Sequence, residues 1–193
     1  MRAPARRFAI PPPPRGMPRR LRVWYAVAAA VVSAVVAASA PFCPATDAQG
    51  RPVWRVEMIN DGDTVTCLDT EGRRVRVRLV GIDAPELDQP KGRESRAALV
   101  AKLAGGLVRV EGDARDQHGR LLGTLRLDDR DLNREMVAEG WAWAFTGFAE
   151  DSDLIAAESA ARRARRGVWA DPQPLPPRQW RELHPPHSGP GSY

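Results

Sequence analysis

The chain has 193 residues, of which 43% are hydrophobic and 27% are charged, a composition typical of one folded domain with tails and not of a disordered chain. Its net charge of +5 suggests a nucleic-acid binder, but residues 1–40 hold seven arginines and no acidic residue, which leaves a net charge of −2 on residues 41–193. A nucleic-acid site in the folded part must therefore be a local patch, because no general positive field surrounds that part.

Residues 1–40 have the pattern of a targeting leader. Arginines precede an apolar run over residues 23–38, and Ala38-Ser39-Ala40 is a small-x-small cleavage pattern. The run is short for a membrane span, so we predict a signal peptide and an exported protein, periplasmic or secreted, with transient membrane association through the leader. The alternative is a signal anchor that leaves the domain outside the membrane. Met1 and Met17 are both candidate starts, and the Pro- and Arg-rich composition before Met17 favours Met17.

The two cysteines leave two interpretations open. In an oxidising compartment Cys43 could form a disulfide with Cys67 and tie the N-terminal arm to a strand. The alternative is one buried thiol and one unpaired thiol. Neither cysteine belongs to a CxxC pair, and the chain has only three histidines, so the sequence argues against a zinc site.

Alternating apolar and polar residues predict three short strands at the start of the folded part. These strands cover residues 53–59, 64–68 and 75–82. Turns at Asn60-Asp61-Gly62 and at residues 69–72 separate them, which is the pattern of a meander.

Further along the chain, predicted helices and strands are mixed. Helices are expected over residues 93–103, from the N-cap Asp131 to Ala138, and over 151–166, and extended segments over 107–111, 121–127 and 141–145. This order predicts a single α+β domain, mainly β, over residues 53–170: a five-stranded OB-type barrel with about three helices. Residues 171–193 are a proline-rich tail in which Trp180 is expected to pack back on the domain.

One short stretch carries an unusual density of reactive groups. A strand that includes Arg78 runs into Gly81 and ends before Pro85, and it is followed closely by Asp83 and Glu86. Taken alone, an arginine beside two acids is equally consistent with a surface ion pair. Loops on a rigid scaffold are, however, where catalytic groups are most often found.

Five motifs then occur in order along the chain. They are Asp61-Gly62-Asp63-Thr64, the segment 78–86, Asp116-Gln117-His118-Gly119-Arg120, Leu132-Asn133 with Gly140-Trp141-Ala142, and Gly167-Val168-Trp169. In content, order and spacing they resemble the staphylococcal nuclease (thermonuclease-like) family, and the resemblance spans residues 53–169. It implies an OB-fold barrel with three helices that uses Ca²⁺ to hydrolyse the phosphodiester bonds of DNA and RNA with little sugar specificity. We expect such an enzyme to act as a monomer.

The resemblance also implies the metal ligands. Asp63 and Asp83 would bind Ca²⁺ with the backbone carbonyl of Ala84 beside them, and Thr64 would support this site without touching the metal. Oxygen ligands are what a hard cation prefers, and such a cation can neutralise a phosphate oxygen and orient a water. Asp61 is expected to be a turn residue and not a ligand.

The remaining roles concern the substrate. By resemblance, Arg78 and Arg120 would hold the scissile phosphate, because the planar guanidinium matches phosphate geometry, and Glu86 would activate the attacking water. Gln117 and His118 stand where the best-known nuclease of the family has a lysine and a tyrosine that help to hold a terminal nucleotide. The cleavage centre is thus complete, while the residues that grip the substrate differ.

Two alternative interpretations of the function remain. A non-enzymatic OB module that binds nucleic acid would be expected to lack Asp63, Glu86 or one of the arginines, and none of these is missing. A membrane-anchored interaction protein would explain the proline-rich ends but not the cluster of charged motifs. The sequence therefore favours an exported calcium-dependent nuclease.

Overall fold

The computed structural model describes residues 18, 21, 45–145, 147 and 151–185. The leader, its cleavage pattern, Cys43 and the candidate starts Met1 and Met17 lie outside the described residues, so the predictions about them stay predictions. Within the described part, no helix is long and apolar enough to cross a membrane. The described residues from 45 to 185 belong to one compact unit.

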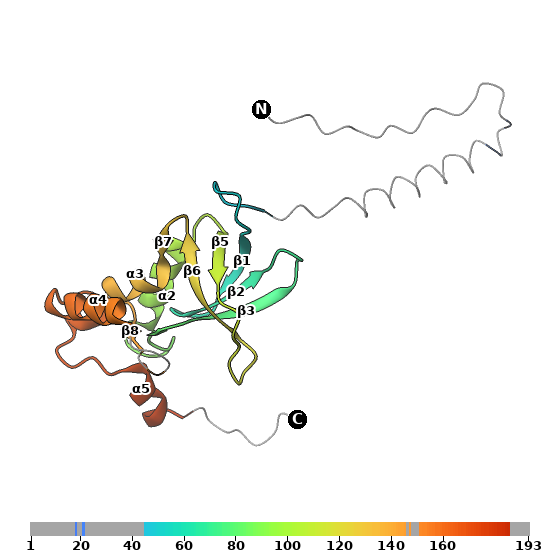
Figure 1. The fold of residues 1–193 in the computed structure, drawn as a ribbon. Coiled ribbons are helices and arrows are strands. Elements are labelled where there is room, and N and C mark those ends of the chain that lie inside the picture. Colours follow the sequence, from blue (N-terminus) through green and yellow to red (C-terminus); the bar gives the residue numbers. More distant parts are fainter. Residues whose placement is uncertain (1–17, 19–20, 22–44, 146, 148–150, 186–193) are drawn as a thin grey trace, which may run out of the picture. The chain divides into compact units, whose positions relative to one another are not determined.

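Five strands close into a mixed barrel, as the sequence predicts (Figure 1). They are β1 (Trp54–Ile59), β2 (Thr64–Leu68), β3 (Arg74–Leu79), β5 (Leu107–Glu111) and β6 (Leu121–Leu127). Neighbours in the order β3-β2-β1-β5-β6 are antiparallel, and β3 pairs with β6 in parallel to complete the ring. In β3 the valines and Leu79 are buried while Arg74 and Arg76 are exposed, because successive side chains of a strand point to opposite faces.

Three two-residue strands lie beside the barrel: β4 (Ile82–Asp83), β7 (Arg130–Asp131) and β8 (Trp143–Ala144). The expected continuous strand over residues 75–82 is wrong in this detail, because Gly81 has a φ of 76° and turns the chain before β4 begins. The expected extended segment over residues 141–145 is reduced to β8, which pairs antiparallel with β4. The turn at Gly81 changes the direction of the chain, so that Asp83 lies beyond the end of β3 and outside the barrel wall.

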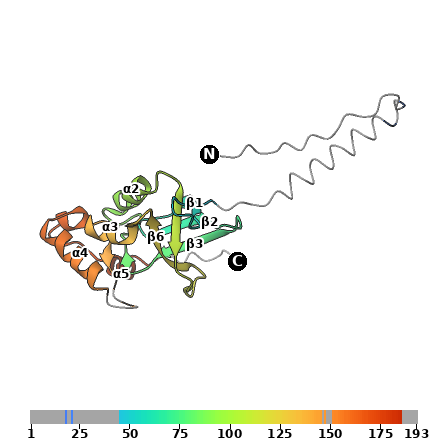
Figure 2. The ribbon, with the colours of Figure 1, turned by 45° about the horizontal axis from the view of Figure 1, so that its top comes forward.

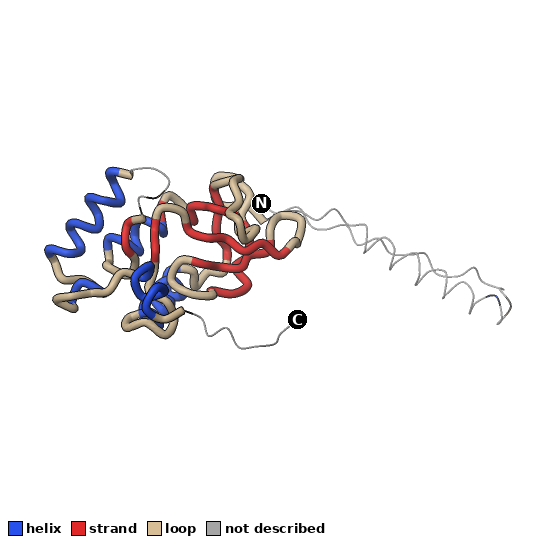
Figure 3. Tube along the Cα trace, turned by 90° about the horizontal axis from the view of Figure 1, so that it is seen from below, coloured by secondary structure: helices blue, strands red, loops and turns tan. Residues whose placement is uncertain are grey.

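Four α-helices are described, against about three expected. They are α2 (Gly92–Lys102), α3 (Leu132–Ala138), α4 (Ser152–Arg163) and α5 (Pro177–Leu183), with a 3-10 turn over Gly167–Ala170. The predicted N-cap Asp131 is confirmed, since its side chain accepts from the Arg134 N–H. For α4, where Asp151 and Ser152 were both candidates, the cap is Asp151, whose side chain accepts from the N–H groups of Asp153 and Leu154. The additional helix is α5, within the proline-rich tail. Figures 2 and 3 show the helices gathered on one side of the strands.

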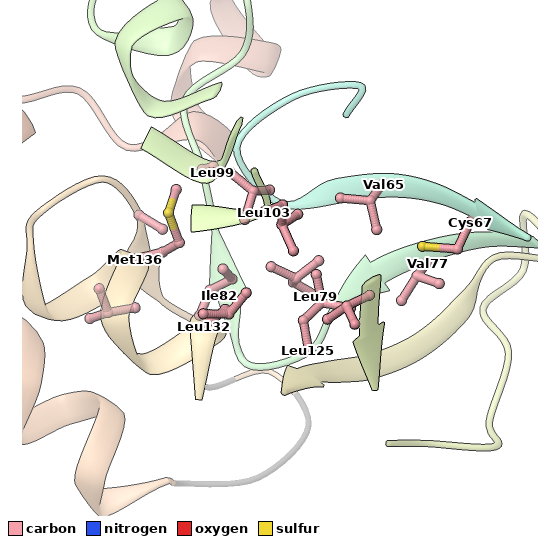
Figure 4. Close-up of a cluster of buried hydrophobic side chains, with 14 of the residues drawn as sticks. Val65, Cys67, Val77, Leu79, Ile82, Leu99, Leu103, Leu125, Leu132 and Met136 are labelled. Carbon is pink, nitrogen blue, oxygen red and sulfur yellow. The ribbon is translucent and has the colours of Figure 1, made fainter. Parts of the chain in front are cut away.

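The main hydrophobic core fills the barrel and the space between the barrel and helices α2 and α3 (Figure 4). Leu79, Leu125 and Leu132 are fully buried at this junction. Cys67 of β2 lies in the same core and forms no disulfide with any described residue, and burial raises the pKa of its thiol to about 12.

A smaller cluster fixes the helices that follow the barrel. The rings of Trp143 and Trp169 meet edge to face with centroids 5.1 Å apart, and the Arg162 guanidinium lies 4.3 Å from the Trp169 centroid. This packing holds the 3-10 turn and α4 against β8, and β8 in turn pairs with the strand that carries Asp83.

Candidate active site

The turn between β1 and β2 presents Asp63 to the end of the barrel. The Asp61 carboxylate accepts a hydrogen bond from the Asp63 N–H at 2.9 Å, which shapes this turn as the sequence predicts for Asp61. Gly62 is required here because a Cβ would lie 2.0 Å from the Ser95 hydroxyl oxygen and 2.8 Å from the Ala84 Cβ. The turn is thus pressed against α2, and Asp63 points inward with only 6% of its surface exposed.

The hydrogen bonds of Asp63 join two distant segments. One carboxylate oxygen accepts from the Thr64 hydroxyl at 2.9 Å, and the other accepts from the Ala84 N–H at 2.7 Å. Thr64, predicted to support the metal site, therefore contacts the predicted ligand Asp63 directly. Through the bond to Ala84, the turn before β2 is tied directly to the segment that carries Asp83.

Arg78 lies between the two predicted metal ligands. Its guanidinium is 3.0 Å from an oxygen of Asp63 and 3.0 Å from an oxygen of Asp83. It also donates to the backbone carbonyls of Leu79 and Ile82 at 3.0 and 2.8 Å. With 17% of the side chain exposed and four acceptors around it, this guanidinium has a fixed position and keeps one side open to a ligand.

The charge state of Asp63 follows from its burial. Burial raises the pKa of Asp63 to about 7, the neighbouring Arg78 opposes this rise, and the charges of Asp61 and Asp83 add to it. A carboxyl group whose ionisation is costly in the folded protein gains from a cation placed beside it. A buried carboxyl group with a raised pKa is therefore what we expect of a metal ligand when no cation lies beside it.

Asn133 of α3 braces the turn that precedes Asp83. Its side-chain amide donates to the Val80 and Gly123 carbonyls at 2.9 and 3.2 Å, and its oxygen accepts from the Leu125 N–H at 3.1 Å. The Leu132-Asn133 motif singled out from the sequence is therefore a structural tie between α3, β6 and the end of β3. It sets the direction in which the chain enters the site.

Glu86 stands at the rim of the same site. Its side chain is 37% exposed, and its backbone N–H donates to the buried side-chain oxygen of Gln89 at 3.2 Å. The loop after Glu86 is short, because α2 already begins at Gly92. A Cβ on Gly92 would lie 1.7 Å from the Glu86 carbonyl oxygen, so this close approach requires glycine.

Arg120 reaches the site from the hairpin between β5 and β6. The Asp116 carboxylate accepts from Arg120 Nε at 2.7 Å and from the backbone N–H groups of His118 and Arg120 at 2.9 and 3.0 Å. Gln117 and His118 are exposed at the tip of this loop. Asp116 thus orients the Arg120 guanidinium, and this role was not assigned from the sequence.

Two adjoining cavities connect these residues. The first has a volume of about 520 Å³, within the range of small-molecule sites, and the second has about 640 Å³. The first is lined by four carboxylates and four arginines, namely Asp61, Asp63, Asp83, Glu86, Arg76, Arg78, Arg120 and Arg181. His118, Arg78, Arg120 and Arg181 line both cavities, whereas Gln117 lines only the second.

The structure therefore brings all of the residues predicted for the centre to one cavity, and it adds Arg76 and Arg181. Arg76 could have been found from its place two residues before Arg78 on the same face of β3. Arg181 lies 98 residues from Asp83 in the chain, and no local pattern in the sequence points to it.

The donor set suits a hard cation. Among the described residues no three His, Cys, Asp or Glu side chains form a metal-binding group. The pair Asp63 and Asp83, completed by the Ala84 carbonyl and water, is still sufficient for Ca²⁺, which accepts several water ligands. The raised pKa of Asp63 is consistent with such a site.

Comparison with known proteins agrees with this geometry. Residues 76–171 match the family described as staphylococcal nuclease homologue. A protein of Haemophilus influenzae named "Uncharacterized endonuclease" is 37% identical over 127 residues, which cover 66% of this chain and 71% of the relative. An Escherichia coli O157:H7 protein with the same name is 40% identical over 128 residues, covering 66% of this chain and 83% of the relative.

A plant protein extends the similarity. The "Probable staphylococcal-like nuclease CAN2" of Oryza sativa subsp. japonica is 38% identical over 119 residues, which cover 61% of this chain and 32% of the relative. Residues 76–171, which match the family, include Arg78, Asp83, Glu86 and Arg120, and these four residues line the first cavity. By fold, by the order of its motifs and by these relatives, the chain belongs to the staphylococcal nuclease homologue family.

Proposed function

We propose that this protein is a calcium-dependent nuclease that hydrolyses phosphodiester bonds of DNA and RNA with little sugar specificity. The observation that carries the proposal is the position of Arg78, fixed between the buried carboxylates of Asp63 and Asp83 in a cavity that Glu86 and Arg120 also line. The relatives named endonucleases and the family to which the chain belongs support it.

In the proposed reaction the arginines bind the scissile phosphate. Arg78 keeps one side open towards the cavity, and Arg120 is held by Asp116 so that its guanidinium faces the same space. Two planar guanidinium groups can each form paired hydrogen bonds to phosphate oxygens, and they stabilise the negative charge that grows in the transition state. The contacts of Arg78 with Asp63 and Asp83, and of Arg120 with Asp116, are already formed, so these carboxylates need not move far when the phosphate binds.

Glu86 is the proposed general base. It takes a proton from a water molecule, the water oxygen attacks phosphorus, and the bond from phosphorus to the leaving oxygen breaks. The leaving oxygen takes a proton from solvent and Glu86 returns its own to solvent, which yields a phosphate monoester and an alcohol. Ca²⁺ held by Asp63, Asp83 and the Ala84 carbonyl would supply positive charge to a non-bridging oxygen and help to orient the water. The partial exposure of Glu86 leaves room for water beside it.

The test uses residues 41–193, which include the whole compact unit from residue 44 onward. Single-stranded DNA and RNA are incubated with Ca²⁺ and then with a chelator. We expect cleavage of both that the chelator abolishes, and a loss of about 10²- to 10⁴-fold in kcat for Glu86→Gln. Asp88→Asn, an exposed acid of the same loop, is the matched control and should retain full activity. Absence of cleavage with binding retained would support a binding module and overturn the proposal.

We also propose that the protein is exported, on the strength of the leader pattern in residues 1–40. A fusion of these residues to a phosphatase that is active only outside the cytoplasm should show activity. Replacing the apolar run by polar residues should abolish it. A silent wild-type fusion would contradict export.

A further inference from the structure

The C-terminal segment that follows the family-matched residues 76–171 returns to the site. The buried Gln89 side chain donates to the Leu175 carbonyl at 2.6 Å, while its oxygen accepts from the Glu86 N–H. Pro177, the first residue of α5, is buried. Trp180 lines a small cavity of about 90 Å³ together with Gln89 and Trp143. The loop that carries Glu86 and the segment that carries α5 are thus held together through Gln89.

This arrangement places the Arg181 guanidinium against Glu86 at the rim of the site and against the buried carboxylate of Asp83. It lies 2.7 Å from an oxygen of Glu86 and 3.1 Å from an oxygen of Asp83. The side chain is 48% exposed, and it lines both the cavity that holds Arg78 and the adjoining cavity that holds Gln117. Arg181 therefore stands on the wall that the two cavities share.

We propose that Arg181 is a further substrate-binding residue, which binds a backbone phosphate next to the scissile one on a DNA or RNA strand that occupies both cavities. The inference rests on the proposed nuclease function and adds a contact supplied by α5. A strand that places one phosphate at Arg78 and continues into the second cavity must pass this guanidinium. An arginine at that point meets the next phosphate with the planar geometry that suits it.

The strength of the existing ion pairs favours this role over that of a latch that shuts the site. The pair with Glu86 joins two partly exposed side chains, and such pairs change an equilibrium by about fivefold at most, because water screens them and the long side chains lose freedom. Asp83 is buried, but it is also paired with Arg78 at 3.0 Å, so it keeps a charged partner when Arg181 turns to a phosphate. The Arg181 guanidinium can therefore exchange its carboxylate partners for a phosphate with little loss of free energy, while the backbone of Arg181 stays in place within α5.

Binding of single-stranded DNA to residues 41–193 tests the proposal without cleavage. It is measured in Ca²⁺ on a Glu86→Gln parent, whose amide oxygen still accepts a hydrogen bond from Arg181. Loss of one phosphate contact lowers the slope of log K against log salt by about 0.7, which corresponds to about eightfold weaker binding at about 50 mM salt and about threefold at about 200 mM. We expect Arg181→Ala to show this change and Arg181→Lys to keep the slope.

Arg178→Ala is the matched control, because Arg178 belongs to the same helix, pairs with Glu182 and lines neither cavity. It should leave the slope unchanged. In the active enzyme, Arg181→Ala should raise KM by about eightfold at about 50 mM salt with kcat nearly unchanged. Titration of Ca²⁺ by calorimetry should give the same affinity for Arg181→Ala and the wild type within about fivefold.

Three results would overturn the proposal: equal slopes for the parent and Arg181→Ala, equal effects of Arg181→Ala and Arg178→Ala, or faster cleavage with much tighter Ca²⁺ binding in Arg181→Ala. The last result would identify α5 as an inhibitory latch. Because the slope is read from binding, a wild type that binds DNA but does not cleave it would refute the proposed function and leave the contact measurable. A parent without salt-dependent binding would refute both.

Discussion

The buried carboxyl group of Asp63 should make the metal-free protein less stable as the pH rises. In the folded state Asp63 keeps its proton up to a pH of about 7, whereas the unfolded chain releases it near the ordinary value of 3.8. Between these values the folded state binds more protons than the unfolded state, so the free energy of unfolding falls with rising pH. Replacing Asp63 by asparagine removes this proton and keeps the shape of the side chain.

The size of the effect follows from the shift in pKa. A difference of about three pKa units at about 1.4 kcal/mol each sets an upper limit of about 4 kcal/mol above pH 7. The ion pair with Arg78 at 3.0 Å reduces the cost of ionising Asp63, and that contribution is already included in the raised pKa. We expect the wild type to lose about 2 to 3 kcal/mol of stability relative to Asp63→Asn between about pH 5 and about pH 8.5, because about two of the three pKa units lie between pH 5 and pH 7.

Urea unfolding in the presence of a chelator measures this difference. The comparison uses both proteins at both pH values, so that groups shared by the two proteins cancel. Adding Ca²⁺ at about 100 times its Kd should then restore about 2.7 kcal/mol to the wild type at the higher pH and nothing to the variant, since only the intact site binds the ion. Parallel stability curves for the two proteins over this pH range would refute the reasoning, as would equal stabilisation by Ca²⁺.

Three further substitutions test how the fold positions the site. Asn133→Ala removes the side-chain partner of the Leu125 N–H and of the Val80 carbonyl, while the Gly123 carbonyl keeps the bond from the Val80 N–H. The free energy of unfolding should fall by about 2 to 5 kcal/mol in urea titrations, and a loss below about 1 kcal/mol would contradict this account. Gly92→Ala pushes a methyl group into the Glu86 carbonyl and should lower kcat by about 10²-fold, whereas Gly105→Ala, where a Cβ meets nothing within 4 Å, should leave kcat unchanged. Asp116→Asn keeps an acceptor for the loop N–H groups but weakens the bond to Arg120 Nε, so kcat/KM should fall by about tenfold while the melting temperature stays the same; unchanged kinetics would show that Arg120 needs no such support.

The secondary structure was largely predictable because its signals are local. Alternation of apolar and polar residues identified the strands around Val77 and Leu79, and the carboxylates of Asp131 and Asp151 marked helix starts. The interrupted strand after Leu79 shows the limit of such patterns. A glycine can continue a strand or turn it, and in this chain the amide of Asn133, brought from α3, holds the turn at Val80.

The candidate site was found from motifs, but its electrostatics came from packing. Sequence alone determined which residue types are available and placed Asp63, Arg78, Asp83, Glu86 and Arg120 on the turns and strand ends of one barrel. Tertiary structure decided that Arg78 sits 3.0 Å from both buried aspartates, that Asp63 is buried deeply enough to raise its pKa to about 7, and that α5 brings Arg181 to the rim. The physical reason is range: strand alternation and helix capping act between neighbours in the chain, whereas burial and ion pairing depend on segments as far apart as residues 83 and 181 that meet only in the folded molecule.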